Sequence, residues 1–253
     1  MSIYTFPHAM RMPLAASCPC HWIMSQYEKP WQAVTQRIER AARAAGRDPR
    51  GIALLAVSKS FPADAVRALH LLGQRAFGEN YMQEAAAKMD ATADLEGVEW
   101  HLIGPLQGNK ARLAAQRFAW VQTIDRRAIA ERLAAARPAH LPPLNVCIQV
   151  NISGEASKSG VAATEVAPLA GIIATLPRLA LRGLMGIAEP TSDTARQRAQ
   201  FAALRRCLDE LRSLGHAVDT LSMGMTADLE AAIAEGATMV RVGTAIFGMR
   251  LNA

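Results

Sequence analysis

Short apolar runs alternate with segments of helical periodicity along most of the chain, and this alternation constrains the fold more than any other feature. The eight apolar runs are 52–57, 75–77, 98–103, 118–122, 144–150, 179–185, 218–221 and 239–242. The helical segments between them are 63–72, 82–89, 110–116, 127–136, 164–176, 193–214 and 227–235. Strands that alternate with helices predict a parallel sheet, because parallel neighbours need a long crossover connection. Runs this apolar indicate strands that are buried on both faces.

The number of strand–helix units favours a closed barrel over an open sheet. Eight units in a chain of 253 residues match a single (β/α)8 TIM barrel, which takes about 250 residues. A doubly wound open sheet is the alternative, and it usually has a glycine-rich turn after its first strand. Here the first run continues into Ser58-Lys59-Ser60-Phe61-Pro62, which contains no glycine. We therefore predict one α/β barrel domain.

The N-terminal stretch differs from the rest of the chain. Residues 1–23 hold three prolines and show no clear helical or strand period. The sequence then restarts at Met24, and over 28–45 the apolar residues recur at helical spacing. We expect 1–23 to be a disordered extension or the product of an upstream start, and 24–253 to form the barrel.

Charge and composition exclude several kinds of partner. The net charge of +6 favours an anionic partner, either a phosphorylated small molecule or a nucleic acid. Aromatic residues make up only 5 % of the chain and the basic residues are spread along it, so no stacking surface for nucleic acid is expected. No apolar run approaches the roughly 20 residues of a membrane helix. The four cysteines form no pair of CxxC motifs, so we expect a cytoplasmic protein with reduced thiols and no metal site.

Lys59 is the first candidate for chemistry, because functional groups of TIM barrels lie at the C-terminal ends of the strands. It follows the first apolar run directly, at a partly desolvated barrel mouth. Desolvation lowers the pKa of a lysine, and a neutral amine can attack an aldehyde to form a Schiff base. The alternative is a surface lysine whose stem packs on apolar neighbours while its amine stays in water.

The ends of the last two runs form a second group of candidates. Ser222-Met223-Gly224-Met225-Thr226 precedes a helical segment, whose N-terminus would attract an anion. Arg241-Val242-Gly243-Thr244 adds a cation, a glycine that lets the backbone approach a ligand, and a hydroxyl. Barrels often bind phosphate after strands seven and eight, although a capping serine and a turn glycine would give the same spacing. Together with Lys59, this site indicates a phosphorylated aldehyde, and pyridoxal 5′-phosphate (PLP) is such a molecule.

A series of ordered motifs from Met24 to Arg250 supports this interpretation. The motifs are Ala56-Val57-Ser58-Lys59, Phe77-Gly78-Glu79-Asn80-Tyr81-Met82-Gln83-Glu84, Trp100-His101-Leu102-Ile103-Gly104-Pro105-Leu106-Gln107-Gly108-Asn109-Lys110, Val150-Asn151-Ile152-Ser153, Lys158-Ser159-Gly160, Leu181-Arg182-Gly183-Leu184-Met185, Leu221-Ser222-Met223-Gly224-Met225 and Arg241-Val242-Gly243-Thr244-Ala245-Ile246-Phe247-Gly248. With these motifs the chain resembles the pyridoxal-phosphate homeostasis protein family, which is related to the N-terminal barrel of alanine racemase.

The resemblance implies a PLP barrel of fold type III that lacks the C-terminal β domain of the racemases. By position, Lys59 resembles the family's lysine that forms the internal aldimine with PLP. Ser222, Gly243 and Thr244 resemble its phosphate ligands.

The resemblance also assigns residues around the cofactor ring. Arg241 resembles the arginine that faces the pyridine nitrogen, and Asn80 resembles a polar residue near the ring. Met185 and Met223 are expected in the same cofactor-binding pocket. A permanent cation beside the ring nitrogen disfavours protonation of that nitrogen. The ring is then a weaker electron sink, which gives carbanion chemistry less support.

Two function classes follow from the resemblance. The first is a non-catalytic protein that holds PLP as a lysine aldimine and takes part in vitamin B6 and amino-acid homeostasis, with PLP-dependent apo-enzymes as candidate partners. The second is a PLP-dependent amino-acid racemase. The related racemases use a further β domain, which supplies a catalytic tyrosine and the dimer contacts, and two-base racemisation needs an acid or base on each face of the substrate. The sequence offers no partner for Lys59 in that role, so we favour a monomeric carrier.

Overall fold

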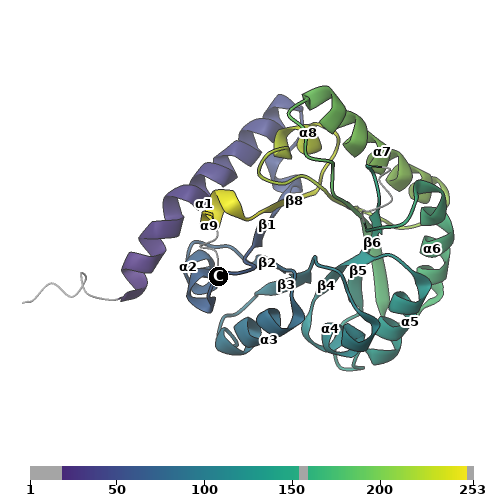
Figure 1. Ribbon diagram of the computed structural model, residues 1–253, viewed down its shortest axis with the longest axis horizontal. Coiled ribbons are helices and arrows are strands. Elements are labelled where there is room, and N and C mark those ends of the chain that lie inside the picture. Colours follow the sequence, from purple (N-terminus) through teal and green to yellow (C-terminus); the bar gives the residue numbers. More distant parts are fainter. Residues whose placement is uncertain (1–18, 154–158, 250–253) are drawn as a thin grey trace, which may run out of the picture.

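Eight parallel strands form a closed barrel in the computed structural model, which describes residues 19–153 and 159–249. The strands pair in sequence order, and the last strand pairs with the first. The strands form the inner ring and the helices the outer layer (Figure 1). The predicted TIM barrel is confirmed, because an open doubly wound sheet would leave two strand edges unpaired.

Every predicted strand is present, displaced at its ends by only a residue or two. The strands are β1 (Ala53–Val57), β2 (Ala76–Glu79), β3 (Glu99–Leu102), β4 (Trp120–Ile124), β5 (Leu144–Val150), β6 (Leu179–Gly186), β7 (Thr220–Ser222) and β8 (Met239–Val242). The apolar runs are buried as expected, since helices cover one face and the barrel interior the other. All the residues of β4 are buried, as are the last three of β1.

The helices between the strands agree with the predicted segments. They are α2 (Ala63–Leu71), α3 (Met82–Ala91), α4 (Ala111–Arg117), α5 (Arg127–Ala136), α6 (Ala163–Thr175), α7 (Thr194–Ser213) and α8 (Leu229–Ala234). Helix α1 (Pro19–Ala44) precedes β1, and α9 (Thr244–Phe247), which the sequence did not predict, follows β8; the 3-10 segments are η1 (Pro49–Gly51) and η2 (Gly108–Lys110). Within the described residues, no helix combines the length and the apolar character needed to cross a lipid bilayer.

Helix α1 begins earlier than the sequence predicts. It starts at Pro19, so residues 19–23 of the expected extension are helical, whereas residues 1–18 lie outside the described part of the chain. A proline at the first helical position leaves the helix intact, because its missing N–H would have no partner inside the helix. The helix packs along α2, α8 and α9 (Figure 1).

The segment after β8 is helical too, and aromatic contacts hold it against the barrel. Phe247 of α9 stacks on Phe61 with ring centroids 5.0 Å apart, and Tyr27 of α1 meets it edge to face at 5.7 Å. Gly243 and Thr244, which begin this segment, are thereby fixed next to the loop after β1.

Gly183 in β6 offers a test of the barrel register. A Cβ atom at this position would lie 1.9 Å from the carbonyl oxygen of Thr220 in β7. The Gly183→Ala substitution should therefore force β6 and β7 apart and lower the free energy of unfolding by about 3 kcal/mol. Gly171→Ala in α6 is the control, since open space surrounds Gly171 and alanine should stabilise that helix by about 1 kcal/mol. Equal urea midpoints for Gly183→Ala and the unsubstituted protein would contradict the register.

Candidate functional site

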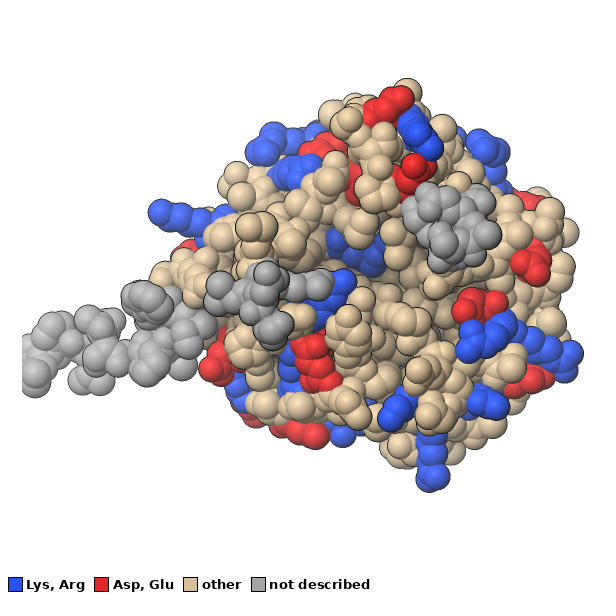
Figure 2. Space-filling model, in the orientation of Figure 1, with Lys and Arg blue, Asp and Glu red and all other residues tan. Residues whose placement is uncertain are grey.

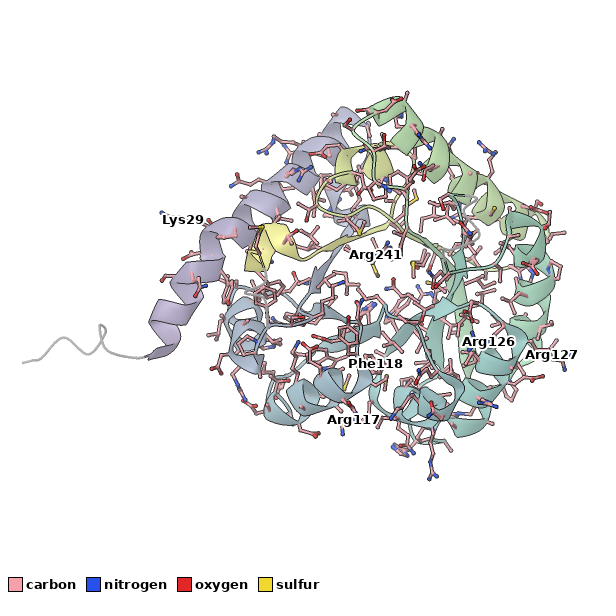
Figure 3. All side chains as sticks on the ribbon, in the orientation of Figure 1. Lys29, Arg117, Phe118, Arg126, Arg127 and Arg241 are labelled. Carbon is pink, nitrogen blue, oxygen red and sulfur yellow. The ribbon has the colours of Figure 1, made fainter. Side chains whose placement is uncertain are left out.

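A cavity of about 350 Å³ opens at the C-terminal ends of the strands. Basic side chains lie in the hollow at the centre of this face (Figure 2), where Arg241 is found at the middle of the barrel (Figure 3). The cavity is lined by Val57, Lys59, Phe61, Asn80, Ile103, Ile187, Met225, Thr226, Ala227, Arg241, Gly243, Thr244 and Gly248. The structure therefore brings five of the predicted cofactor-binding residues around one cavity: Lys59, Asn80, Arg241, Gly243 and Thr244.

The other three predicted residues lie outside this lining. Met185, Ser222 and Met223 are fully buried. Met185 packs inside the barrel, and Met223 belongs to the main apolar core. Thr226 lines the cavity instead. Thr226 belongs to the predicted motif Ser222-Met223-Gly224-Met225-Thr226. The spacing of that motif does not show whether the hydroxyl of Ser222 or that of Thr226 reaches the cavity.

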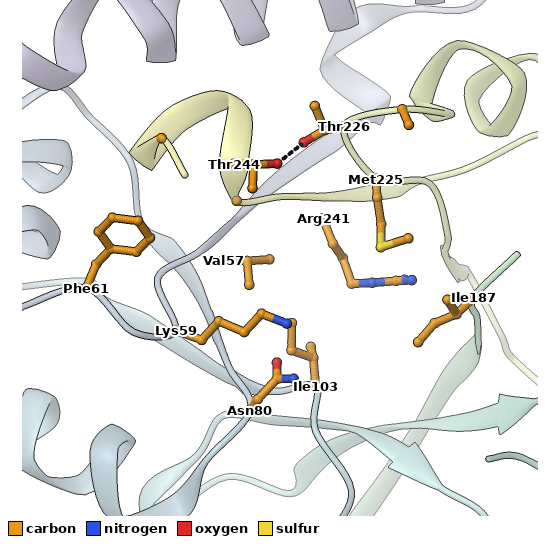
Figure 4. A pocket seen from close by; sticks show the side chains of 13 residues that line it. Val57, Lys59, Phe61, Asn80, Ile103, Ile187, Met225, Thr226, Arg241 and Thr244 are labelled. Atoms are coloured by element: carbon orange, nitrogen blue, oxygen red, sulfur yellow. Dashed lines mark hydrogen bonds between the residues drawn. The ribbon is translucent and has the colours of Figure 1, made fainter. Parts of the chain in front are cut away.

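Lys59 lies in the loop after β1, and its half-buried side chain lines the cavity. The chain extends across the cavity beside Asn80, with Nζ directed toward Ile103 and Arg241 (Figure 4). Apolar side chains of Val57 and Ile103 flank it. The aliphatic stem is thus packed, and the amine is presented to the centre of the cavity.

A buried ammonium group fixes the backbone on the N-terminal side of Lys59. Lys88 of α3 is only 5 % exposed, and its Nζ donates to the carbonyl oxygen of Ser58 over 2.6 Å. The same Nζ donates to Glu79 Oε1 over 2.7 Å, and the Ser58 hydroxyl donates to that oxygen over 2.6 Å. Ser58, which follows β1, is therefore joined by hydrogen bonds to both members of the Lys88–Glu79 ion pair, and Glu79 is the last residue of β2.

The same ammonium group also acts on the C-terminal side of Lys59. Lys88 Nζ donates to Glu84 Oε1 over 2.6 Å, and this carboxylate oxygen accepts a hydrogen bond from the backbone N–H of Ser60. Ser60 adopts a positive φ of 68°, a conformation that costs free energy in a residue other than glycine. The contact with Glu84 supports this turn. We name Lys88, Glu79 and Glu84 the Lys88 clamp.

The Lys88 clamp buries charged groups, and this carries a desolvation cost. Glu79 is fully buried, and in the described structure its Oε2 has no hydrogen-bond partner. Burial raises the pKa of the Glu79 carboxyl, while Lys88 opposes that shift by stabilising the carboxylate. Removing one partner of such a pair leaves an uncompensated buried charge.

Arg241 projects from β8 and is 5 % exposed. Its Nη1 donates to the carbonyl oxygen of Ser222 over 2.6 Å, and its Nη2 donates to the carbonyl oxygen of Gly186 over 2.9 Å. Burial lowers the pKa of the guanidinium to about 10, and the carboxylate of Asp228 partly opposes this shift. Arg241 therefore remains cationic at neutral pH and gives the cavity a fixed positive charge.

Two hydroxyl groups meet at the opposite wall of the cavity. Thr226 Oγ1 in the loop after β7 and Thr244 Oγ1 after β8 are 3.2 Å apart (Figure 4). Arg37 of α1 fixes the first loop, because its Nη1 donates to the Thr226 carbonyl oxygen over 2.7 Å. Helix α8 starts only at Leu229, so the helix N-terminus that the sequence places beside this motif is displaced from Thr226.

The chemistry of these residues fits PLP. The amine of Lys59 suits an aldehyde, and the paired threonine hydroxyls suit the oxygens of a phosphate group. Asn80 Oδ1 is buried and, within the described residues, has no hydrogen-bond partner. Apolar walls with a few convergent polar groups are typical of a small-molecule site.

The fold and this cavity define a (β/α)8 barrel protein of the alanine racemase N-terminal class. Residues 31–251 match the family model described as "Alanine racemase, N-terminal domain". An alanine racemase of Corynebacterium glutamicum shares the fold with a TM-score of 0.65 at 21 % identity, covering 86 % of this chain and 61 % of the racemase.

Within this class, the chain belongs to the pyridoxal phosphate homeostasis protein family. It is 59 % identical over 217 residues to the Pseudomonas aeruginosa protein of that name, covering 86 % of this chain and 93 % of the relative. The Escherichia coli protein of that name is 52 % identical over 219 residues, covering 86 % and 94 %. The structure of Synechococcus elongatus PipY with PLP bound has a TM-score of 0.73 at 38 % identity, covering 83 % of this chain and 99 % of PipY. The predicted family is confirmed.

The Lys88 clamp provides a test of how the site is built. Lys88→Met keeps an unbranched side chain of similar length to the aliphatic stem of lysine but removes the ammonium group. It should lower the free energy of unfolding by about 3–5 kcal/mol, because two carboxylates lose their buried partner. Lys29→Met on the exposed face of α1 is the control and should change stability by less than about 0.5 kcal/mol. Similar urea midpoints for both variants would show that the clamp does not stabilise the loop.

Proposed function

We propose that this protein binds PLP in the cavity at the barrel mouth, holds it covalently through Lys59, and takes part in intracellular PLP and amino-acid homeostasis. The observation that carries the proposal is the convergence of an amine, a buried guanidinium and two hydroxyls on one cavity. PipY, a relative of similar fold, is described with PLP bound, and close relatives carry the homeostasis name.

Lys59 supplies the covalent anchor in this proposal. Its amine would hold PLP through the aldehyde carbon, with a carbon–nitrogen double bond formed by loss of water. Among the described residues, Lys59 is the one lysine that lines the cavity. The Lys88 clamp holds the backbone on both sides of Lys59, so the amine is positioned before the cofactor arrives.

The loops after β7 and β8 would hold the phosphate group. Thr226 and Thr244 present hydroxyls there, and Gly243 lets the backbone come close. A side chain at Gly243 would bring a Cβ atom to 3.2 Å from the carbonyl oxygen of Val57. This assignment gives Thr226 the role that the sequence motif suggests for Ser222.

Arg241 faces the pyridine nitrogen and supports binding over catalysis. A guanidinium that remains cationic beside this nitrogen disfavours its protonation. PLP enzymes that stabilise carbanions use the ring as an electron sink, and an unprotonated ring does this poorly. The residue is therefore suited to holding the cofactor.

The lining of the cavity also favours a carrier over a racemase. Racemisation by two bases needs a proton donor or acceptor on each face of the substrate. In the described part of the chain, Lys59 and Arg241 are the titratable side chains of the lining, and Arg241 is held by carbonyl groups below the cavity. The protein then acts as a cytoplasmic monomer that supplies PLP to PLP-dependent apo-enzymes.

Replacement of Lys59 tests the covalent anchor. Titration of the purified protein with PLP should produce the absorption band of a carbon–nitrogen double bond, and Lys59→Ala should abolish this band while the circular dichroism stays unchanged. Lys110→Ala is the matched control, since Lys110 also lies near the start of a crossover helix but does not line the cavity. A band that survives in Lys59→Ala would place the anchor elsewhere.

Proton exchange separates the carrier from the racemase. The PLP-loaded protein should exchange the α-proton of alanine in D₂O no faster than free PLP does, because an unprotonated ring beside Arg241 stabilises an α-carbanion poorly. The measurement is the loss of the α-proton signal in the NMR spectrum. Rapid exchange that disappears in Lys59→Ala would establish an enzymatic function instead.

A further inference from the structure

A chain of polar side chains crosses the barrel interior below the cavity. It joins His101 of β3, Gln122 of β4, Ser222 of β7 and Arg241 of β8, and all four residues are buried. Arg241 Nη1 donates to Ser222 Oγ over 2.8 Å, and Ser222 Oγ donates to Gln122 Oε1 over 2.6 Å. Gln122 Nε2 lies 2.9 Å from His101 Nδ1. The chain therefore begins at a residue that lines the cavity and ends on the opposite side of the barrel.

The donors and acceptors along the chain set the direction of each bond. A guanidinium can only donate, so Ser222 Oγ accepts from Arg241, and an amide oxygen can only accept, so Ser222 Oγ donates its own hydrogen to Gln122 Oε1. The amide nitrogen of Gln122 then faces His101, and Nδ1 of the imidazole must accept. A neutral His101 with its hydrogen on Nε2 satisfies this order.

The surroundings of His101 support the neutral form. Its ring stacks on Trp120 with centroids 5.2 Å apart and planes 9° apart. Nε2 lies 3.7 Å from Glu99 Oε2, beyond hydrogen-bonding distance. Burial lowers the pKa of His101, although Glu99 acts in the opposite direction.

The chain leaves Ser222 with no hydroxyl hydrogen for a phosphate oxygen. Its side chain is fully buried, its hydroxyl hydrogen is directed to Gln122, and its oxygen accepts from Arg241. Its carbonyl oxygen also accepts from Arg241 Nη1. Ser222 therefore binds one nitrogen of the guanidinium twice, and this fixes the plane of the group.

The remaining contact of Arg241 completes its orientation. Nη2 donates to the carbonyl oxygen of Gly186 at the end of β6, so the guanidinium is held from both β6 and β7. In the described residues no hydrogen-bond partner is found for Nε, and Arg241 lines the cavity between Met225 and Ile187 (Figure 4). A planar donor group held in this way is preorganised for one acceptor above it.

The interior of a TIM barrel is normally filled by branched apolar side chains. A row of buried polar groups carries a desolvation cost that apolar side chains of similar volume would avoid. The row ends at Arg241, which lines the cavity. Orienting the Arg241 side chain is therefore a reason for the buried polar row to be present.

We propose that Ser222, Gln122 and His101 are positioning residues that orient the Arg241 guanidinium toward the ring nitrogen of bound PLP, and that Ser222 does not contact the phosphate. This inference rests on the proposed function of the cavity. It differs from the role that the sequence motif suggests, in which Ser222 is a phosphate ligand.

A comparison of PLP with pyridoxal, which lacks the phosphate, separates the two roles of Ser222. Ser222→Ala should weaken the binding of both molecules by the same factor, about three- to tenfold, and should change the pH dependence of the absorption of bound PLP. Thr226→Val is the matched control at the phosphate side, and it should weaken PLP alone. Ser222→Thr, which keeps the hydroxyl, should restore the absorption profile.

Several results would overturn the inference. If Ser222→Ala loses affinity for PLP but not for pyridoxal, Ser222 is a phosphate ligand. If both affinities and the absorption profile stay unchanged, Ser222 does not orient Arg241. An unsubstituted protein that binds neither molecule would instead overturn the proposed function.

The direction of the chain can be tested without any cofactor. Long-range proton–nitrogen NMR spectra of the unliganded protein should show His101 with the hydrogen on Nε2, assigned by the signals that disappear in His101→Gln. Gln122→Leu should shift the Nδ1 signal of His101. If that variant does not fold, the spectrum of the unsubstituted protein is sufficient, because it shows which ring nitrogen of His101 carries the hydrogen. A hydrogen on Nδ1 would reverse the order of the bonds and contradict the chain.

Discussion

The site depends on the pairing of β1 with β8, because this pairing closes the barrel and places the first and last strands side by side. Leu55 of β1 lies beside Arg241 of β8, and Ala56 lies beside Val242. The loops that follow these strands carry Lys59 and Thr244, which therefore line the same cavity. Parallel strands place all their C-terminal ends at one mouth, so the proposed covalent anchor and the proposed phosphate site lie at the ends of the first and last strands.

Two buried cations organise this mouth in different ways. The ammonium of Lys88 is neutralised by the carboxylates of Glu79 and Glu84, and its contacts stabilise the backbone around Lys59. The guanidinium of Arg241 is held by carbonyl groups and a hydroxyl, and its charge remains available to the cavity. The first group shapes the loop, and the second gives the cavity the positive field that an anionic cofactor requires.

The sequence was sufficient for the strands and for the residues at their ends, since apolar runs and strand termini are local features. It could not distinguish Ser222 from Thr226, because the two hydroxyls belong to one motif and only the packed barrel shows that Ser222 faces inward. The Lys88 clamp and the chain from His101 to Arg241 join segments that are distant in sequence, and no local pattern connects them. The early start of α1 was missed because Pro19 suggests irregular structure, although a proline at the first helical position is compatible with a helix.

The proposed covalent link between PLP and Lys59 can be tested by reduction followed by peptide mapping. The protein would be loaded with PLP, treated with borohydride and digested, and the modified peptide identified by mass spectrometry. A single stoichiometric adduct on the peptide that contains Lys59 is expected. An adduct distributed over surface lysines, or no adduct at all, would contradict the proposed link.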